Sequence, residues 1–165
     1  MNLKRLLRHW FTTDLTRRRT FPTHVLTAIE EQIRASEKQH GGEIRFAIET
    51  ALDGPVLWQE IPARQHAIDL FAQLRVWDTE HNNGVLILVL LADRDVEIVA
   101  DRGYRDRVSD GAWEGVCRAM EAEFRAGRFE TGAIKGIQAI TSIIAPLFPP
   151  QPRDPNELPD RPALL

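Results

Sequence analysis

The sequence predicts an α/β fold, a three-layer helix–sheet–helix sandwich with a central mixed, mostly parallel sheet and one antiparallel hairpin. The segment Gly84 to Leu91 is almost entirely apolar, as is typical of a strand that is covered on both faces. Asp93 to Asp95 then forms a tight turn and Val96 to Ala100 returns, which predicts the hairpin. An alternating strand over Glu43 to Thr50 precedes a helix, so the first two strands are predicted to be parallel with a right-handed crossover.

The helices are predicted from apolar residues that recur every three or four positions. One helix is expected from Pro22 to Gly41, and a second from Pro62 to Asp78 with Trp77 on its buried face. Ser109 or Asp110 can cap a third helix, which ends at Gly127. A last helix is expected over roughly Glu130 to Ile144.

Length and composition indicate a single soluble domain. The chain has 165 residues and a net charge of −3, so attraction to nucleic acid is not indicated. Its one cysteine, Cys117, excludes an intrachain disulfide and a zinc site built from cysteines. The basic N-terminus is followed by Arg17 to Arg19 where a signal peptide would have an apolar stretch, so we expect a cytoplasmic protein.

Three parts are expected along the chain: a basic amphipathic N-terminal helix over residues 1–20, an α/β domain over residues 21–148, and a Pro-rich tail over residues 149–165. Seven of the ten prolines lie from Pro146 onward. Because proline cannot donate a backbone hydrogen bond, we expect the tail to be extended or disordered and to form neither helix nor strand.

The N-terminal helix has two distinct faces. Its apolar face carries Leu3, Leu7, Trp10 and Phe11, and its basic face carries Lys4, Arg5 and Arg8. Such a helix can lie on an anionic membrane, where each basic residue adds about 1 kcal/mol of binding. Alternatively, its apolar face packs on this domain or on a second copy, which is the commoner use of such a stripe.

The predicted topology brings polar loops to one end of the sheet. The loop that enters the second strand and the segment that leaves the third should converge there, with six side chains in reach: Asp78, Glu80, Asn82, Asn83, Asp101 and Asp110. Oxygen ligands from several loops suit calcium or magnesium, and a magnesium ion can orient a phosphate. The alternative is that these residues only form turns and helix caps in a solvated loop cluster.

Several segments resemble the TPM domain family. They are GGEIRFAIE, NNGVLILVLLADRDVEIVADRG and FRAGRFETGAIKGIQAI, and the resemblance runs from about Phe21 to Phe148. It implies an α/β sandwich. Some members of the family resemble acid phosphatases or bind calcium or magnesium, and others are assembly or repair factors. Bacterial members often accompany a LemA-type membrane protein, which the resemblance therefore suggests as a partner.

Two departures from the family pattern weaken the expectation of a metal. Asn82 stands where fuller motifs have an aspartate, and Arg105 stands in the place of a glutamate, while Asp110 keeps its carboxylate. Arg102 and Arg105 stay charged and repel a divalent cation. An arginine-rich edge is better suited to an anion, such as a phosphate or an acidic partner segment.

Our first interpretation is therefore an accessory or interaction protein, peripheral to the inner membrane, with a degenerate metal or anion site and no cofactor. The alternative is a calcium- or magnesium-dependent phosphatase. In it Asp78, Asp101 and Asp110 would hold the ion and Asn82 and Asn83 would orient it.

Overall fold

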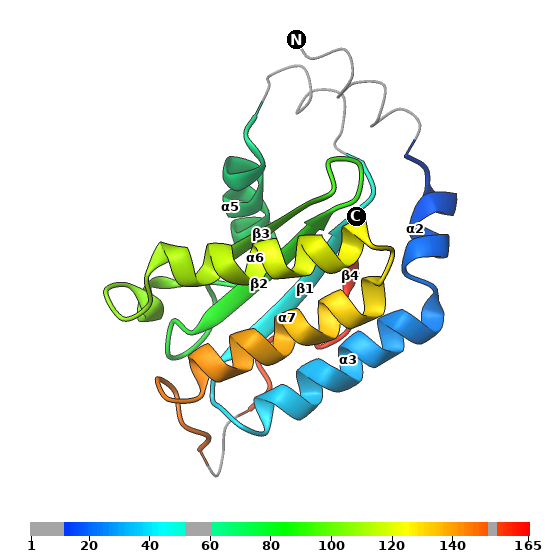
Figure 1. Cartoon of the computed structure of the whole chain (residues 1–165). Helices are drawn as coiled ribbons and strands as arrows, with labels where there is room; N and C mark the ends of the chain where they lie inside the picture. Colours follow the sequence, from blue (N-terminus) through cyan, green and yellow to red (C-terminus); the bar gives the residue numbers. More distant parts are fainter. Residues whose placement is uncertain (1–11, 52–60, 152–154) are drawn as a thin grey trace.

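The computed structural model describes residues 12–51, 61–151 and 155–165, and Figure 1 shows their arrangement. The described elements are α2 (Asp14–Thr20), α3 (Thr23–Glu37), β1 (Glu43–Glu49), α5 (Ala63–Gln73), β2 (Gly84–Leu90), β3 (Asp95–Ala100), the 3-10 helix η1 (Arg102–Tyr104), α6 (Asp110–Arg125), α7 (Phe129–Ile144) and β4 (Ala163–Leu164). The strands lie in the order β3-β2-β1-β4.

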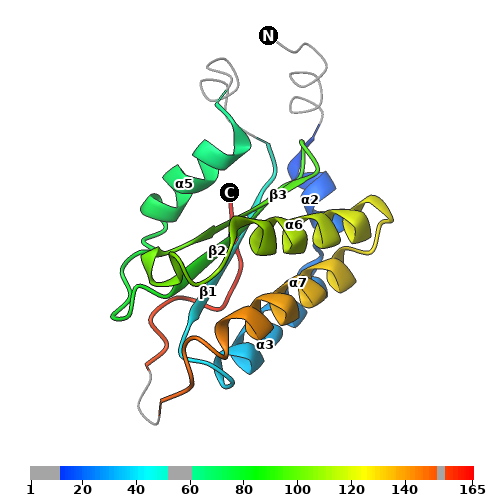
Figure 2. The same ribbon diagram turned by 60° about the vertical axis from the view of Figure 1, so that its left-hand side comes forward.

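The predicted mixed sheet is confirmed. β1 and β2 are parallel, with Phe46 opposite Ile87, and α5 makes the crossover between them. β3 returns antiparallel to β2, with Ile98 also opposite Ile87. Figure 2 shows the layers: α5 covers one face of the sheet, and α3, α6 and α7 cover the other.

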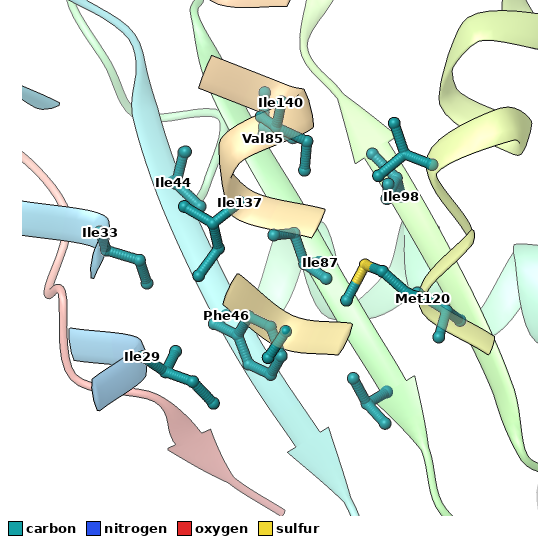
Figure 3. Packing of buried hydrophobic residues seen from close by; sticks show 14 of the residues in the cluster. Ile29, Ile33, Ile44, Phe46, Val85, Ile87, Ile98, Met120, Ile137 and Ile140 are labelled. Carbon is teal, nitrogen blue, oxygen red and sulfur yellow. The ribbon is translucent and has the colours of Figure 1, made fainter. Parts of the chain in front are cut away.

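The core follows from the alternation of side chains along the strands. On β1 the even-numbered residues Ile44, Phe46 and Ile48 face the three-helix layer, whereas Ala47 faces α5. Figure 3 shows the larger cluster, in which residues of α3, α6 and α7 close over the sheet. Every residue of β2 is buried, as its apolar composition predicts for a strand with helices on both sides.

The second predicted helix ends earlier than its sequence pattern suggests. α5 stops at Gln73, and Arg75 has a positive φ of 55° that turns the chain. The helical phase is lost there, so Val76 is fully buried and Trp77 is 49% exposed. The prediction that Trp77 lies in the core is therefore wrong.

The Pro-rich tail also differs from its prediction. Residues 163–164 form β4, which pairs parallel with β1 through Ala47 and Ile48. Leu158 and Asp160 upstream of it are buried, at 6% and 7% exposure. The prediction that the tail forms no strand is wrong, because side chains of the domain bind the tail's backbone.

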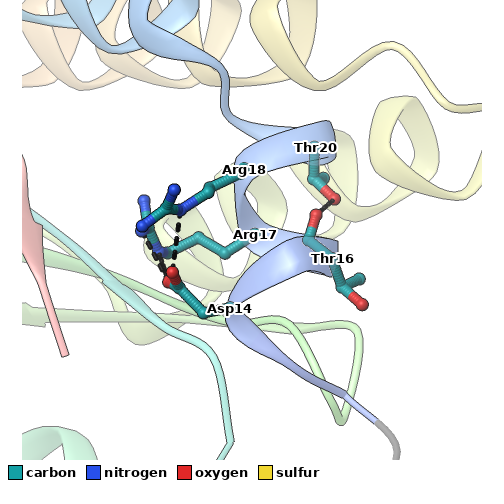
Figure 4. Close-up of polar contacts among 5 residues, drawn as sticks. All are labelled: Asp14, Thr16, Arg17, Arg18 and Thr20. Carbon is teal, nitrogen blue, oxygen red and sulfur yellow. Dashed lines mark hydrogen bonds and ion pairs between the residues drawn. The ribbon is translucent and has the colours of Figure 1, made fainter.

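The apolar and basic residues predicted for the N-terminal helix, from Leu3 to Phe11, lie outside the described residues. The helix α2 that follows buries none of its residues. Figure 4 shows that the side chains of Arg17 and Arg18 both pair with Asp14. The Arg17 Nη2 lies 2.6 Å from Asp14 Oδ1, and the Arg18 Nε lies 2.8 Å from Asp14 Oδ2. No described helix combines the length and the apolar character needed to cross a lipid bilayer.

Candidate functional site

Two loops meet at one end of the sheet, and we call them together the strand-end site. The entry loop, residues 78–83, leads into β2, and the exit loop, residues 101–105, follows β3. The Arg102 Nε donates to Asn82 Oδ1 at 2.7 Å, and the Gly103 N–H donates to the Asn82 carbonyl at 2.9 Å. The structure therefore brings Asn82, Asp101 and Arg102 together, although they are about twenty residues apart in the chain.

Local backbone chemistry explains why the loops fit so closely. Asn82 has a φ of 53°, a left-handed conformation that asparagine tolerates better than most residues. A Cβ on Gly103 would lie closer than 3.0 Å to the Asn82 carbonyl oxygen, so only glycine permits this approach. The Asp101 side chain accepts from the Arg102 N–H at 2.6 Å and so caps η1.

Asn83 and Tyr104 form the buried floor of the strand-end site. The Tyr104 hydroxyl donates to the Asn83 carbonyl at 2.8 Å, and the Glu43 N–H donates to the same oxygen at 3.2 Å. The Asn83 Nδ2 donates to the Gly41 carbonyl. Burial raises the pKa of Tyr104 above its ordinary value, so the phenol stays protonated and can donate.

Two buried oxygens of this region lack a hydrogen-bond donor among the described residues: Asn83 Oδ1 and Asp101 Oδ2. A buried acceptor left unsatisfied costs about 1–3 kcal/mol, so both atoms favour a donor or a cation from outside the chain. Oxygen is the ligand type that calcium and magnesium require. However, residues 12–51, 61–151 and 155–165 contain no group of three His, Cys, Asp or Glu side chains arranged to hold a metal.

The structure places the other predicted site residues differently. The Asp78 carboxylate pairs with Arg75 at 2.8 Å, and both side chains are at least half exposed. The Glu80 N–H donates to the Glu157 carboxylate at 3.0 Å and 3.2 Å. The Arg105 N–H donates to the Arg102 carbonyl at 3.0 Å and thereby ends η1.

Asp110 begins α6 and lines a separate groove of about 450 Å³ between α6 and β3. The other polar residues along this groove are Arg64, Asp95, Glu97, Glu114, Arg118 and Glu121. Burial and a hydrogen bond with Glu121 raise the pKa of Asp95 to about 6. Sequence reasoning missed this groove, although Asp95 and Glu97 share one strand face and Glu114, Arg118 and Glu121 recur at helical spacing.

Sequence reasoning also missed two buried histidines with hydroxyl or carboxyl neighbours. The Ser36 Oγ lies 2.8 Å from His40 Nε2 and 2.6 Å from the Thr141 hydroxyl, which joins α3 to α7. The His66 Nε2 lies 2.6 Å from Glu49 Oε2. No sequence motif marks either cluster, because their members come from separate elements.

Comparisons with known proteins agree with this fold. The family model of the TPM domain matches residues 18–143. The NMR structure of BA42 protein from the psychrophilic bacterium Bizionia argentinensis is 32% identical, with a TM-score of 0.75, over 86% of this chain and 93% of that one. The solution NMR structure of the N-terminal domain of a protein from P. gingivalis is 20% identical, with a TM-score of 0.58, over 72% of each chain, and shows likeness of fold alone. No curated protein matches the chain.

Proposed function

The chain belongs to the TPM domain family, and on that premise we propose that it is an accessory protein whose strand-end site binds a ligand or partner without turnover. The observation that supports this proposal is the hydrogen bond from Arg102 Nε to Asn82 Oδ1. It gives the amide oxygen at position 82 a donor from the protein itself. It also fixes a permanent positive charge beside the entry loop, which opposes a divalent cation.

The chemistry of the strand-end site is better suited to an anion. A guanidinium carries five N–H donors, and Arg102 uses Nε on Asn82, so its terminal nitrogens suit a phosphate or carboxylate oxygen. Arg105 adds a second positive charge three residues later. The proposed ligand is therefore a phosphate group or an acidic segment of a partner protein.

A calcium- or magnesium-dependent phosphatase is the second candidate. It is favoured by the unsatisfied Asn83 Oδ1 and Asp101 Oδ2, which are oxygens of the type such ions prefer. In that case the Asp101 carboxylate and the Asn83 amide oxygen would hold the ion. The bound ion would supply charge that polarises a phosphate ester.

Calorimetric titrations of the full chain with inorganic phosphate, calcium and magnesium, together with a phosphate-ester assay, separate the two candidates. The accessory proposal expects phosphate binding that Arg102→Ala abolishes, and no turnover with either metal. Arg75→Ala is the matched control, because Arg75 is also an arginine that donates to a neighbouring side chain, that of Asp78 at the start of the entry loop. Magnesium-dependent turnover that Asp101→Asn eliminates would replace this proposal with the second.

The accessory proposal includes an association with the inner membrane through the basic segment of residues 1–20, and with a LemA-type membrane protein. The alternation of apolar and basic residues in that segment supports it. Flotation with anionic vesicles, with and without a reconstituted LemA-type protein, tests both parts. Equal flotation by a chain without residues 1–20 would contradict the role of the segment.

A further inference from the structure

Residues 155–165, which we call the strap, lie along the edge of β1 that faces away from β2 (Figures 1 and 2). β4 within the strap contributes only the two ladder pairs with Ala47 and Ile48. The Leu165 N–H donates to the Ile48 carbonyl at 2.9 Å, and the Thr50 N–H donates to the Leu165 carbonyl at 3.2 Å. Elsewhere along this edge, side chains of β1 contact the strap.

Those side chains bind the backbone of the strap. The Arg45 guanidinium donates to the carbonyls of Pro159 and Arg161, at 2.7 Å and 2.6 Å. The Glu43 carboxylate accepts from the Leu158 N–H at 3.0 Å. Recognition through backbone groups tolerates many sequences, as in other complexes in which an extended peptide is added to a sheet edge.

The side chains of Leu158 and Asp160 in the strap are also buried against the domain. Leu158 is 6% exposed and packs in the cluster between the sheet and α5. Asp160 is 7% exposed, accepts from Asn156 Nδ2 at 2.6 Å and pairs with Arg34 Nε at 3.2 Å. Arg161, between the buried Asp160 and Pro162, is exposed, and its carbonyl accepts from Arg45.

The charged groups around Asp160 favour a single ionised carboxylate at this position. The carboxyl group of Glu37 lies near it, and Arg34 is a cation paired with it. Burial, followed by the charge of Glu43, raises the pKa of Glu37 to about 9, so Glu37 is neutral at pH 7 and hydrogen-bonds with Asp160. The site therefore accepts one carboxylate from an extended segment.

The strap also contacts the strand-end site. The Glu157 carboxylate accepts from the Glu80 N–H in the entry loop. Glu43 binds the strap through its carboxylate and the Asn83 carbonyl through its N–H. Whatever occupies the β1 edge therefore helps to position the entry loop.

We propose that the outer edge of β1, with Arg34, Glu43 and Arg45, is a docking site for an extended partner peptide that carries a leucine and, two residues later, an acidic residue. The strap occupies this site within the chain and competes with the partner. This inference deepens the proposed accessory function, since it names the kind of partner and links its binding to the strand-end site.

The test uses the full chain with residues 152–154 replaced by a protease site. The chain folds with its strap attached, is then cut, and is titrated with a fluorescent peptide of residues 155–165 while anisotropy is recorded. We expect the labelled peptide to exchange into the cut protein and to saturate it. A peptide with Leu158→Ala should bind about 30-fold more weakly, the lower range for loss of a buried leucine. A peptide with Asp160→Lys should fail to bind, and one with Arg161→Ala should bind as the original does.

A second variant avoids cutting the chain. Intact protein with Leu158→Ala has a weakened strap, so it should bind the labelled peptide at least about tenfold more tightly than the intact wild type does. The attached strap of the wild type competes at an effective concentration of about 1 mM. The proposal is overturned if the cut strap never exchanges, if its departure unfolds the protein, or if the Asp160→Lys peptide binds equally well. Phosphate binding at Arg102 is measured separately, so failure of the docking site leaves the accessory proposal to its own test.

Discussion

Gly103→Ala should destabilise the protein because the exit loop has no room for a methyl group. The new Cβ would lie closer than 3.0 Å to the Asn82 carbonyl oxygen and 3.1 Å from the His81 carbonyl oxygen. Both neighbours are backbone atoms, which cannot rotate away. Overpacking of this kind costs about 1–3 kcal/mol, and the lower entropy of the unfolded alanine chain offsets about 0.4–1 kcal/mol. We therefore expect Gly103→Ala to lower the free energy of unfolding by about 1–2 kcal/mol in total.

Thermal unfolding followed by far-UV circular dichroism measures this loss. For a chain of this size, 1 kcal/mol corresponds to about 2–4 °C, so Tm should fall by about 2–8 °C. Gly115→Ala is the matched control, because Gly115 is inside α6 and nothing lies within 4 Å of the position that its new methyl group would take. There alanine should stabilise the helix by about 0.5–1 kcal/mol. The reasoning is refuted if Gly103→Ala raises Tm as Gly115→Ala does.

Three further changes test the polar groups of the fold. Tyr104→Phe removes the hydroxyl that donates to the Asn83 carbonyl. Urea unfolding should therefore show a free energy of unfolding that is lower by about 1 kcal/mol. Burial lowers the pKa of His40 to about 4, so the unfolded chain gains a proton that the folded chain excludes as pH falls from 6.5 to 4. The stability present above pH 6.5 should therefore fall by up to about 3 kcal/mol, and His40→Gln should remove this decline; an unchanged pH profile in the variant would show that His40 is not its source. The raised pKa of Glu37 changes stability in the opposite direction. Its contribution to the free energy of unfolding is complete below pH 4.5 and declines as pH rises to about 9. In Glu37→Gln this alkaline decline should be smaller, as measured by urea midpoints at about pH 5 and about pH 9, and a decline as steep as that of the wild type would contradict the assignment.

The elements that the sequence predicts well are those whose burial is periodic. β2 is apolar throughout because both its faces are covered, and α6 ends where Gly127 adopts a φ of 76°. The hairpin follows from a polar turn between two apolar runs. These signals are local, so they are present in the sequence before any tertiary contact forms.

The errors occur where a local pattern is overridden. Trp77 continues the apolar spacing of α5, but the left-handed Arg75 changes the direction of the chain, and Val76 takes the buried place. The strap has no strand periodicity and many prolines, yet Arg45 and Glu43 bind its backbone. Their contribution comes from residues more than 110 positions away, which no local pattern in the tail reveals.

At the strand-end site the sequence indicated which residue types gather at one end of the sheet, and the metal assignment to Asp78, Asp101 and Asp110 stays a prediction. The hydrogen bond of Arg102 with Asn82 and the two unsatisfied oxygens emerge only from the structure. Whether a polar group meets a donor depends on the path of both loops to within an ångström.

By itself, the sequence determined the order of the elements from α3 to α7 and the two faces of the sheet, because the spacing of apolar residues records which side of each element is buried. The family resemblance came from the sequence motifs and not from this spacing. Tertiary structure alone decided which distant polar groups became partners: the Glu80 N–H with the Glu157 carboxylate, and Arg34 with Asp160. Polar pairing carries no period along the chain, since a hydrogen bond forms wherever folding brings a donor to an acceptor.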